Sequence, residues 1–362
     1  MNVAVVGGGI FGTTAAIELA RHGHSVDLYE REGDLLCAAS GINQYRLHRG
    51  YHYPRSLETA IASRDAEKSF RASYPDAVID DNAHYYAIAN KGSQTSACDF
   101  LGFLSAARLE HEQQELSCLC GEQVDLVVRV RESLFDPERL RAIVWERLRA
   151  LQVRVHLGVS VQPDALTKHD HIVLATYASL GGMVSDEGAS NYQFEVCEKP
   201  VVRLPETLAR TSIVIMDGPF MCVDPLGRTG LAVMGNVVHA LHHTNVGRTP
   251  EVPDALVGML NRGIVRKPSV TRFQDFIESA SRFIPTIRSA EHIGSMFTVR
   301  AVLPGLDDTD ARPTLVVKRS ERVFTLFSGK IGTCVRAAEE LVSMIGRTSG
   351  RQPPQGDVRS VG

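Results

Sequence analysis

Residues 2–30, NVAVVGGGIFGTTAAIELARHGHSVDLYE, decide the fold. The segment begins with a short run rich in valine, which is typical of a buried parallel strand. A turn with glycines in the spacing G-x-G-x-x-G follows, and alanine, isoleucine and leucine then recur at helical spacing over residues 13–22. A second strand is expected over residues 25–29, with Glu30 at its end. The segment therefore predicts a strand, a tight turn, a helix and a second strand.

Each glycine of this turn has a separate physical role. Gly7 permits the tight turn, Gly9 lets the backbone approach a pyrophosphate, and Gly12 lets the helix pack closely on the strand. The free N–H groups at the start of the helix suit phosphate groups. Glu30 is placed to accept hydrogen bonds from a ribose. The pattern predicts a dinucleotide-binding site, but the turn alone does not separate FAD from NAD.

Length and composition exclude several classes of protein. The 362 residues suffice for one large domain or two ordinary ones. The sequence has no stretch of 18 apolar residues, so no membrane-spanning helix is expected. The near balance of 39 basic and 42 acidic residues argues against a nucleic-acid partner. Seven cysteines without regular spacing and the absence of a signal peptide favour a cytoplasmic protein with reduced thiols.

A second informative segment is residues 37–51, CAASGINQYRLHRGY. Small residues are followed by an asparagine and then by a run of basic and aromatic residues. With the first 30 residues, this segment resembles the glycine oxidase/D-amino-acid oxidase superfamily of FAD enzymes, which includes sarcosine oxidases and L-2-hydroxyglutarate dehydrogenases. The resemblance extends over residues 1–60, 123–180 and 296–345. It implies that the cofactor is FAD, held without a covalent bond.

The resemblance also implies a set of cofactor contacts. Val161 is expected to meet the adenine, and a strand ending at Ala175 and Thr176 to close the FAD site, although Tyr177 stands where the family usually has glycine. The segment Ser328–Thr333 is expected to cover the pyrimidine edge of the flavin, with Lys330 stabilising negative charge on the reduced ring. Besides Gly7, Gly9, Gly12 and Glu30, the expected cofactor residues are Ile10, Phe11, Arg31, Ser40, Asn43, Gln44, Val161, Ala175, Thr176, Gly329, Lys330, Ile331, Gly332 and Thr333.

Four residues are expected to act on the substrate. Arg46, His48 and Tyr51 are expected along the flavin ring, where His48 could accept a proton from the substrate. Arg300 is the expected carboxylate clamp, because its guanidinium offers a planar fork. The structural alternative for Arg300 is an arginine in a salt bridge between strands.

These features favour an FAD-dependent oxidase or dehydrogenase that moves a hydride from the α-carbon of an amino acid or small amine to flavin N5. Oxidation of a 2-hydroxy acid is the nearest alternative, and a flavoprotein without turnover is the alternative of another class. The adenine and pyrimidine-edge segments argue against a plain NAD dehydrogenase. The substrate is expected to be a small molecule, and the electron acceptor, O2 or another carrier, stays open.

The expected architecture is α/β, with a Rossmann-type FAD-binding domain and an inserted, mostly antiparallel β substrate domain that carries helices. Apolar residues alternate with period two between 190 and 240, as antiparallel strands require. The FAD-binding domain is expected over residues 1–80, 123–185 and 299–345, and the substrate domain over 81–122 and 186–298. A disordered tail is expected over 346–362, which has almost no apolar residues.

Three other patterns are not expected to carry chemistry. Among His239, His242 and His243, two residues form an i, i+3 pair. A metal site needs a third ligand, and none is spaced to join that pair, so no metal is expected. Asp217-Gly218 imitates a pair found in flavin hydroxylases but follows the wrong strand, which disfavours a hydroxylase. Cys334 is expected to be a small apolar core residue rather than a point of covalent flavin attachment.

Overall fold

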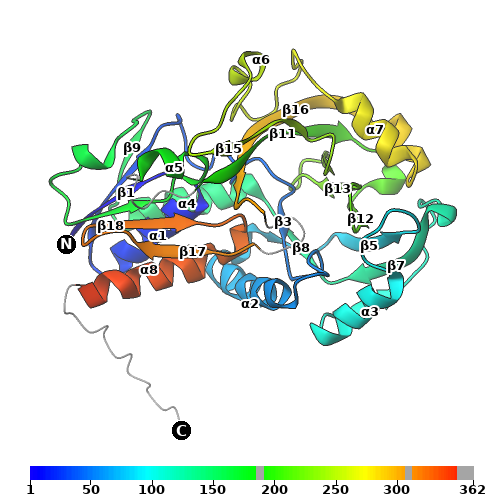
Figure 1. Ribbon diagram of the computed structural model, residues 1–362, viewed down its shortest axis with the longest axis horizontal. Coiled ribbons are helices and arrows are strands. Elements are labelled where there is room, and N and C mark those ends of the chain that lie inside the picture. Colours follow the sequence, from blue (N-terminus) through cyan, green and yellow to red (C-terminus); the bar gives the residue numbers. More distant parts are fainter. Residues whose placement is uncertain (185–190, 306–311, 349–362) are drawn as a thin grey trace, which may run out of the picture.

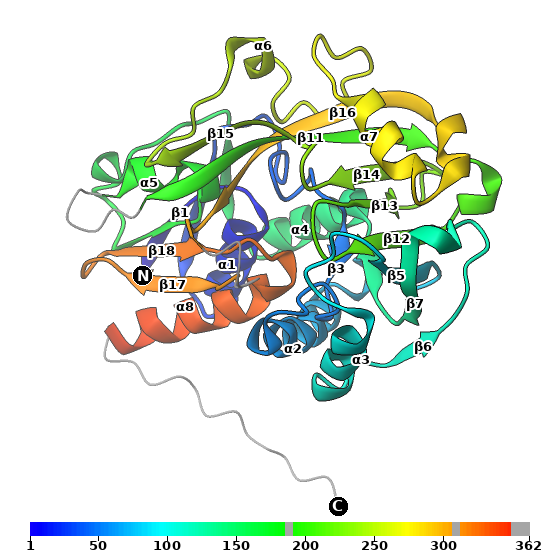
Figure 2. The ribbon, with the colours of Figure 1, turned by 45° about the vertical axis from the view of Figure 1, so that its right-hand side comes forward.

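The computed structural model describes residues 1–184, 191–305 and 312–348. In these ranges the strands form one sheet of six strands, one of nine and one of three. Figure 1 shows the six-stranded sheet and its helices at the left and the nine-stranded sheet at the right, with two long strands, β11 and β16, arching over the top. Figure 2 shows the strands of the larger sheet side by side.

The six-stranded sheet has the order β17-β18-β10-β1-β2-β9. All neighbouring pairs are parallel except β17 and β18. The central strand β1 carries only small and β-branched apolar residues from its second position on, because it is covered on both faces. The strands are β1 (Asn2–Val6), β2 (Ser25–Glu30), β9 (Arg154–Leu157), β10 (His171–Leu174), β17 (Leu315–Lys318) and β18 (Val323–Phe327).

Helices pack on one face of this sheet. Val3 and Val5 of β1 share an apolar cluster with α1 (Ile10–Arg21), α4 (Pro137–Ala150) and α8 (Cys334–Thr348). Helix α4 begins where the side chain of Asp136 accepts hydrogen bonds from the first N–H groups, which satisfies donors that have no partner within the helix. On the other face, residues of β1 and β10 pack against residues of β11 and β16.

The nine-stranded sheet has the order β15-β11-β14-β13-β12-β5-β7-β6, with β16 paired to β11. Its pairs are antiparallel except β5 and β12. Its strands are β5 (Ala83–Ala89), β6 (His111–Gln113), β7 (Val124–Val130), β11 (Tyr192–Arg203), β12 (Thr211–Met216), β13 (Met221–Pro225), β14 (Ala232–Asn236), β15 (Leu241–Gly247) and β16 (Glu291–Val302).

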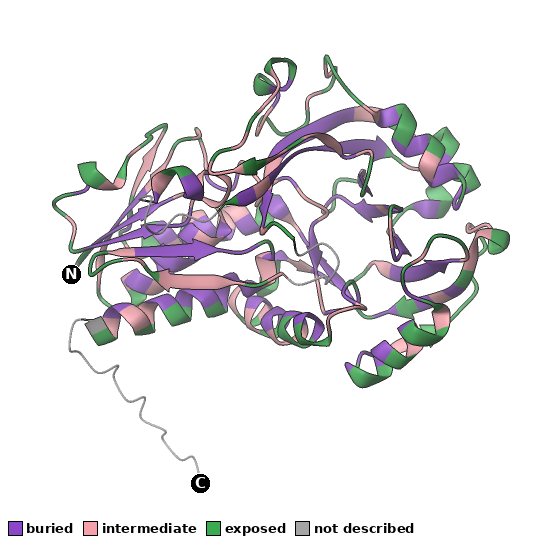
Figure 3. Ribbon diagram, viewed as in Figure 1, coloured by how far each residue is buried: buried purple, intermediate pink, exposed green. Residues whose placement is uncertain are grey.

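The remaining elements are a small sheet, five helices and several short turns within the described residues. The small sheet contains β3 (Arg46–Leu47), β4 (Val78–Ile79) and β8 (Ser133–Phe135). The remaining helices are α2 (Leu57–Ser73), α3 (Ala97–Ala106), α5 (Leu180–Met183), α6 (Asp254–Val257) and α7 (Phe273–Ser281). Short 3₁₀ turns lie at Pro75–Ala77, Gly121–Gln123, Pro163–Ala165, Tyr177–Ser179, Glu206–Leu208, Pro285–Ser289 and Ile331–Thr333. Figure 3 shows that the central strands are buried, whereas helices such as α7 and α8 combine buried and exposed residues. None of the described helices combines the length and apolar character needed to cross a bilayer.

The Rossmann-type core and the mostly antiparallel second sheet agree with the expected α/β architecture, but the sheets divide the chain differently from the expected boundaries. β7 follows the boundary at 123, yet it pairs with β5 and β6 in the nine-stranded sheet. β16 crosses the boundary at 298 as one continuous strand. Helix α8 continues to Thr348, so residues 346–348 are helical, and residues 349–362 of the expected tail lie outside the described residues.

Candidate functional site

A cavity of about 620 Å³ lies between the glycine-rich end of the six-stranded sheet and the facing strands β11 and β16. Its volume is in the usual range for ligand sites, about 300–1,000 Å³. Most of the expected cofactor residues line it: Gly7, Gly9, Ile10, Phe11, Glu30, Arg31, Ser40, Asn43, Gln44, Val161, Ala175, Thr176, Gly329, Lys330 and Ile331. The structure therefore brings segments that are far apart in the sequence to one cavity.

The glycine turn at the start of α1 leaves no room for side chains. Gly7 has φ +107°, and a Cβ atom there would lie 2.5 Å from the carbonyl oxygen of Ala175. A Cβ at Gly12 would lie 1.8 Å from the carbonyl oxygen of Gly7. Gly12 thus serves helix packing and does not line the cavity, whereas Gly9 does. This is the arrangement that close approach of a pyrophosphate requires.

The start of α1 is also suited to an anion. No side chain caps the helix at Gly9, and its first turn has no acidic residue. The hydroxyl of Ser40 accepts a hydrogen bond from the N–H of Ile10 at 3.0 Å. Glu30 accepts hydrogen bonds from the N–H groups of Gly8, at 2.5 Å, and Glu32, at 2.8 Å, which fix its carboxylate at the cavity wall. The residues present therefore fit FAD.

The turn after β18 brings a buried lysine to the cavity. Lys330 Nζ donates to Ser63 Oγ at 3.2 Å and lies 4.5 Å from the centre of the Tyr53 ring. Burial, with the positive charge of Arg312, lowers the pKa of Lys330 to about 7. Thr333 does not line the cavity; its hydroxyl donates to the carbonyl of Lys330 at 2.9 Å and so holds the turn. Gly332 also lies outside the cavity lining.

Arg46 borders the cavity, but its guanidinium is engaged elsewhere. It lies 3.0 Å from Glu132 Oε2 and 2.6 Å from Asp224 Oδ1, and it donates to Ser212 Oγ at 2.7 Å. All three partners are buried. Burial alone would lower the pKa of Arg46, but the negative charge of Asp224, with that of Glu132, raises it well above its ordinary value. Arg46 therefore lies at the cavity wall with its guanidinium against two buried carboxyl groups, and its expected place along the flavin ring stays a prediction.

His48 lines the cavity beside the same cluster. Its Nδ1 lies 3.4 Å from Glu132 Oε1, and its side chain is partly exposed. Tyr86 donates to the other oxygen of Glu132 at 2.7 Å. Burial alone would raise the pKa of Glu132, but the neighbouring His48 and Arg46 lower it, so the carboxylate is charged. The ring of His48 also stacks on His52, with ring centres 5.2 Å apart.

Tyr51 lies away from the cavity, in contrast to the expectation. Its hydroxyl donates to the carbonyl of Glu110 at 2.7 Å, and its ring packs among buried apolar residues such as Phe100 and Leu104. The two following residues, His52 and Tyr53, line the cavity instead. Besides these two, the sequence analysis missed Glu132, Asp224 and Lys199. They come from separate parts of the chain, and no local spacing in the sequence connects them.

Arg300 lines the cavity from β16 and forms a salt bridge between strands. Its guanidinium lies 2.8 Å from Glu195 Oε2 on β11, directly opposite in the strand register. The structural alternative for Arg300, a salt bridge between strands, is therefore present, although the side chain is 42% exposed and still borders the cavity.

A cluster of three or more metal-ligating side chains is absent from the described residues.

Two other patterns have structural roles. Asp217 lies in the turn between β12 and β13, where it pairs with Arg55 at 2.9 Å, so Asp217-Gly218 takes no part in the cavity. Cys334 is absent from the described residues that line the cavity. Cys334 is buried in the core beneath α1.

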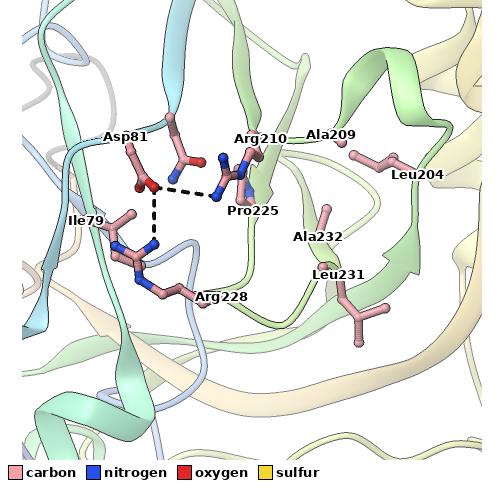
Figure 4. A pocket seen from close by; sticks show the side chains of 12 residues that line it. Ile79, Asp81, Leu204, Ala209, Arg210, Pro225, Arg228, Leu231 and Ala232 are labelled. Carbon is pink, nitrogen blue, oxygen red and sulfur yellow. Dashed lines mark hydrogen bonds and ion pairs between the residues drawn. The ribbon is translucent and has the colours of Figure 1, made fainter.

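A second, smaller cavity of about 190 Å³ lies near the start of β14. Asp81 forms ion pairs there with Arg228 at 3.1 Å and with Arg210 at 3.5 Å (Figure 4). One carboxylate thus faces two guanidinium groups, and the remaining lining is largely apolar. None of the expected site residues lines this second cavity.

Comparison with known proteins agrees with this geometry. The chain is 26% identical over 355 residues to the FAD-dependent monooxygenase FPY4 of Fusarium mangiferae, which covers 95% of this chain and 91% of that protein. The structure is similar to glycine oxidase from Geobacillus kaustophilus, with a TM-score of 0.73, 14% identity and 99% of each chain covered. It is also similar to L-α-glycerophosphate oxidase from Mycoplasma pneumoniae with FAD bound, with a TM-score of 0.70, 14% identity and 95% and 94% of the chains covered. Residues 2–328 match the family model described as FAD dependent oxidoreductase, DAO, so the chain belongs to this family of FAD-dependent oxidoreductases.

Proposed function

We propose that this enzyme oxidises the carbon–nitrogen bond of an amino acid or small amine, with loss of a hydride from the α-carbon. The observation that carries the proposal is that one cavity is lined both by the cofactor segments and by His48, whose imidazole lies beside the buried carboxylate of Glu132. FAD, when bound, supplies the hydride acceptor. The fold of glycine oxidase, which is similar over 99% of each chain, supports the choice of a C–N bond.

His48 is the proposed proton acceptor. Since Glu132 lies beside Nδ1, it favours the tautomer that carries a proton on Nδ1 and leaves Nε2 as the basic atom. An ammonium group must lose a proton before its α-carbon gives up a hydride, and an imidazole on the cavity wall is placed to accept that proton. Glu132 is a positioning residue, since it acts through the imidazole.

Two other reactions have specific support. Oxidation of an alcohol carbon, as in a 2-hydroxy acid, needs the same base, and the fold is shared with L-α-glycerophosphate oxidase. Transfer of an oxygen atom is supported by the relative FPY4, which is named a monooxygenase. The proposed cavity residues serve all three reactions, so the products decide between them.

The test is anaerobic mixing of the purified yellow enzyme with amino acids, amines and 2-hydroxy acids, while the absorbance of oxidised flavin is followed. C–N oxidation predicts bleaching by a nitrogen-containing substrate and release of one ammonia or amine per flavin reduced. Bleaching by a 2-hydroxy acid, with the corresponding keto acid as product, would assign the enzyme to alcohol oxidation. If no candidate substrate bleaches the flavin, and turnover in air needs an added reductant such as NADPH and places ¹⁸O from ¹⁸O2 in the product, the enzyme is a monooxygenase and the proposal fails.

A further inference from the structure

Lys199 on β11 is a buried lysine at the wall of the main cavity. It lies opposite Met296 of β16, lines the main cavity and is 5% exposed. Residues 195, 197 and 199 share one face of β11, because side chains alternate along a strand. Within residues 1–184, 191–305 and 312–348, no hydrogen bond or ion pair of the Lys199 ammonium is present.

The charged groups around Lys199 do not balance it. The ionisable groups near it are Glu195 and Cys197 on β11, Arg300 on β16 and Cys222 on β13. Glu195 is engaged by Arg300 at 2.8 Å. Burial raises the pKa of both thiols, that of Cys222 to about 12, so both thiols are neutral and Arg300 adds positive charge.

An ammonium in such a place needs an anion. A buried charge is costly unless it is paired and hydrogen-bonded. The side chains described around Lys199 supply no free carboxylate, whereas the open volume of the cavity lies beside it. A ligand in that volume is therefore the available source of the missing negative charge.

We propose that Lys199 binds the acid group of the substrate, so that the enzyme acts on an anionic substrate, with a carboxylate seated against the β11 face of the cavity. This assignment rests on the proposed function, which supplies the reaction that the bound substrate undergoes. It differs from the expectation for Arg300, because that guanidinium already faces Glu195. In the free enzyme, burial lowers the pKa of Lys199, and an anion beside it raises the pKa again. Binding should therefore weaken as the pH rises through the alkaline range.

The experiment uses the FAD-loaded enzyme and unreactive probes, so that it does not depend on turnover. Acetate and benzoate are titrated while the flavin absorbance spectrum is followed, with acetamide and benzamide as uncharged counterparts. In Lys199→Met the carboxylates should bind about thirty-fold or more weakly, and the amides should be unaffected. Lys199→Arg should keep carboxylate affinity within a few-fold. Lys168→Met, at an exposed position, is the control and should match the wild type.

Methionine fills the volume of the lysine stem without its charge, so Lys199→Met should fold and retain FAD. Loss of FAD from this variant would overturn the proposal, because it would make Lys199 a cofactor or structural residue. Equal affinity of the wild type for benzoate and benzamide would also overturn it.

The two proposals fail separately. If benzoate binding depends on Lys199 but no nitrogen-containing substrate reduces the flavin, the proposed function fails and the anion site stands. If an amino acid reduces the flavin with the same KM in Lys199→Met as in the wild type, the anion site fails and the proposed function stands.

Discussion

Replacement of Arg46 by methionine tests whether this side chain supports the cavity wall or acts on the substrate. Its guanidinium is buried between Glu132 and Asp224, at 3.0 Å and 2.6 Å. Arg46→Met leaves both carboxylates buried without their main cation. Removal of one partner from a buried ion pair costs about 3–5 kcal/mol. The effect should therefore appear first in the free energy of unfolding.

The size of the shift in the unfolding midpoint follows from the length of the chain. At roughly 2.1 cal/mol/K of unfolding entropy per residue, 362 residues have an unfolding entropy of about 0.8 kcal/mol/K. A loss of about 3–5 kcal/mol then lowers Tm by about 4–7 °C. The loss should shrink at acidic pH, because in the variant the two carboxylates have raised pKa values in the folded state, and protonation relieves the burial of their charge.

Thermal unfolding of the FAD-loaded protein, followed by circular dichroism, is the assay. Arg203→Met is the matched control, since Arg203 forms an exposed ion pair with Glu291 and should cost no more than about 1 kcal/mol. The double variant Arg46→Met with Glu132→Gln should be more stable than the two single losses imply, because the residues share one interaction. A Tm within error of the control, together with loss of flavin reduction, would refute the structural role.

Three further substitutions probe the cavity. Glu30→Ala should weaken FAD binding by roughly 1.5–3 kcal/mol, measured by fluorescence titration of the apoprotein; an unchanged affinity would show that Glu30 does not meet the ribose. Glu195→Gln should tighten benzoate binding several-fold, because it leaves Arg300 without its counter-charge; weaker binding would place the probe away from β16. Lys330 has a pKa of about 7 in the folded protein and about 10.4 when unfolded. The unfolded chain therefore binds more protons between these values, and the apoprotein should gain up to roughly 3–5 kcal/mol of stability as the pH rises through this window. Urea unfolding of Lys330→Met should lack that gain, and an equal gain in the variant would show that Lys330 does not titrate there.

The sequence was sufficient for the parts of the fold that depend on local spacing. Gly12 has a role that a residue nearby in the chain, Gly7, defines, and the strands on either side of α1 lie where the sequence predicted them. The sheet to which β7 belongs, by contrast, could not be predicted from local spacing. Its alternating burial suits an antiparallel strand, but its partners β5 and β6 are selected by long-range packing.

Side-chain directions in the segment after β3 could not be predicted in the same way. Tyr51 turns away from the cavity because its hydroxyl reaches the carbonyl of Glu110, while His52 and Tyr53 turn toward it. Irregular backbone has no fixed period, so only tertiary contacts decide such directions.

The buried charges could not be predicted from the sequence for a related reason. Glu132 and Asp224 meet Arg46 only after β3, β8 and β13 have been brought together. Lys199 is one residue of a long strand, and no residue near it in the sequence marks it as unpaired. Its significance comes from its burial and from the engagement of Glu195 by Arg300.

The central claim is that the enzyme breaks a C–H bond at the carbon that bears nitrogen. The most direct measurement is the rate of anaerobic flavin reduction by the best nitrogen-containing substrate, compared between the ordinary compound and the compound deuterated at the α-carbon. Slower reduction by the deuterated substrate, together with release of ammonia or amine, is the result that the account predicts. Equal rates for the two compounds under conditions where reduction is slower than binding, or a flavin that no nitrogen-containing substrate reduces in the absence of O2, would contradict it.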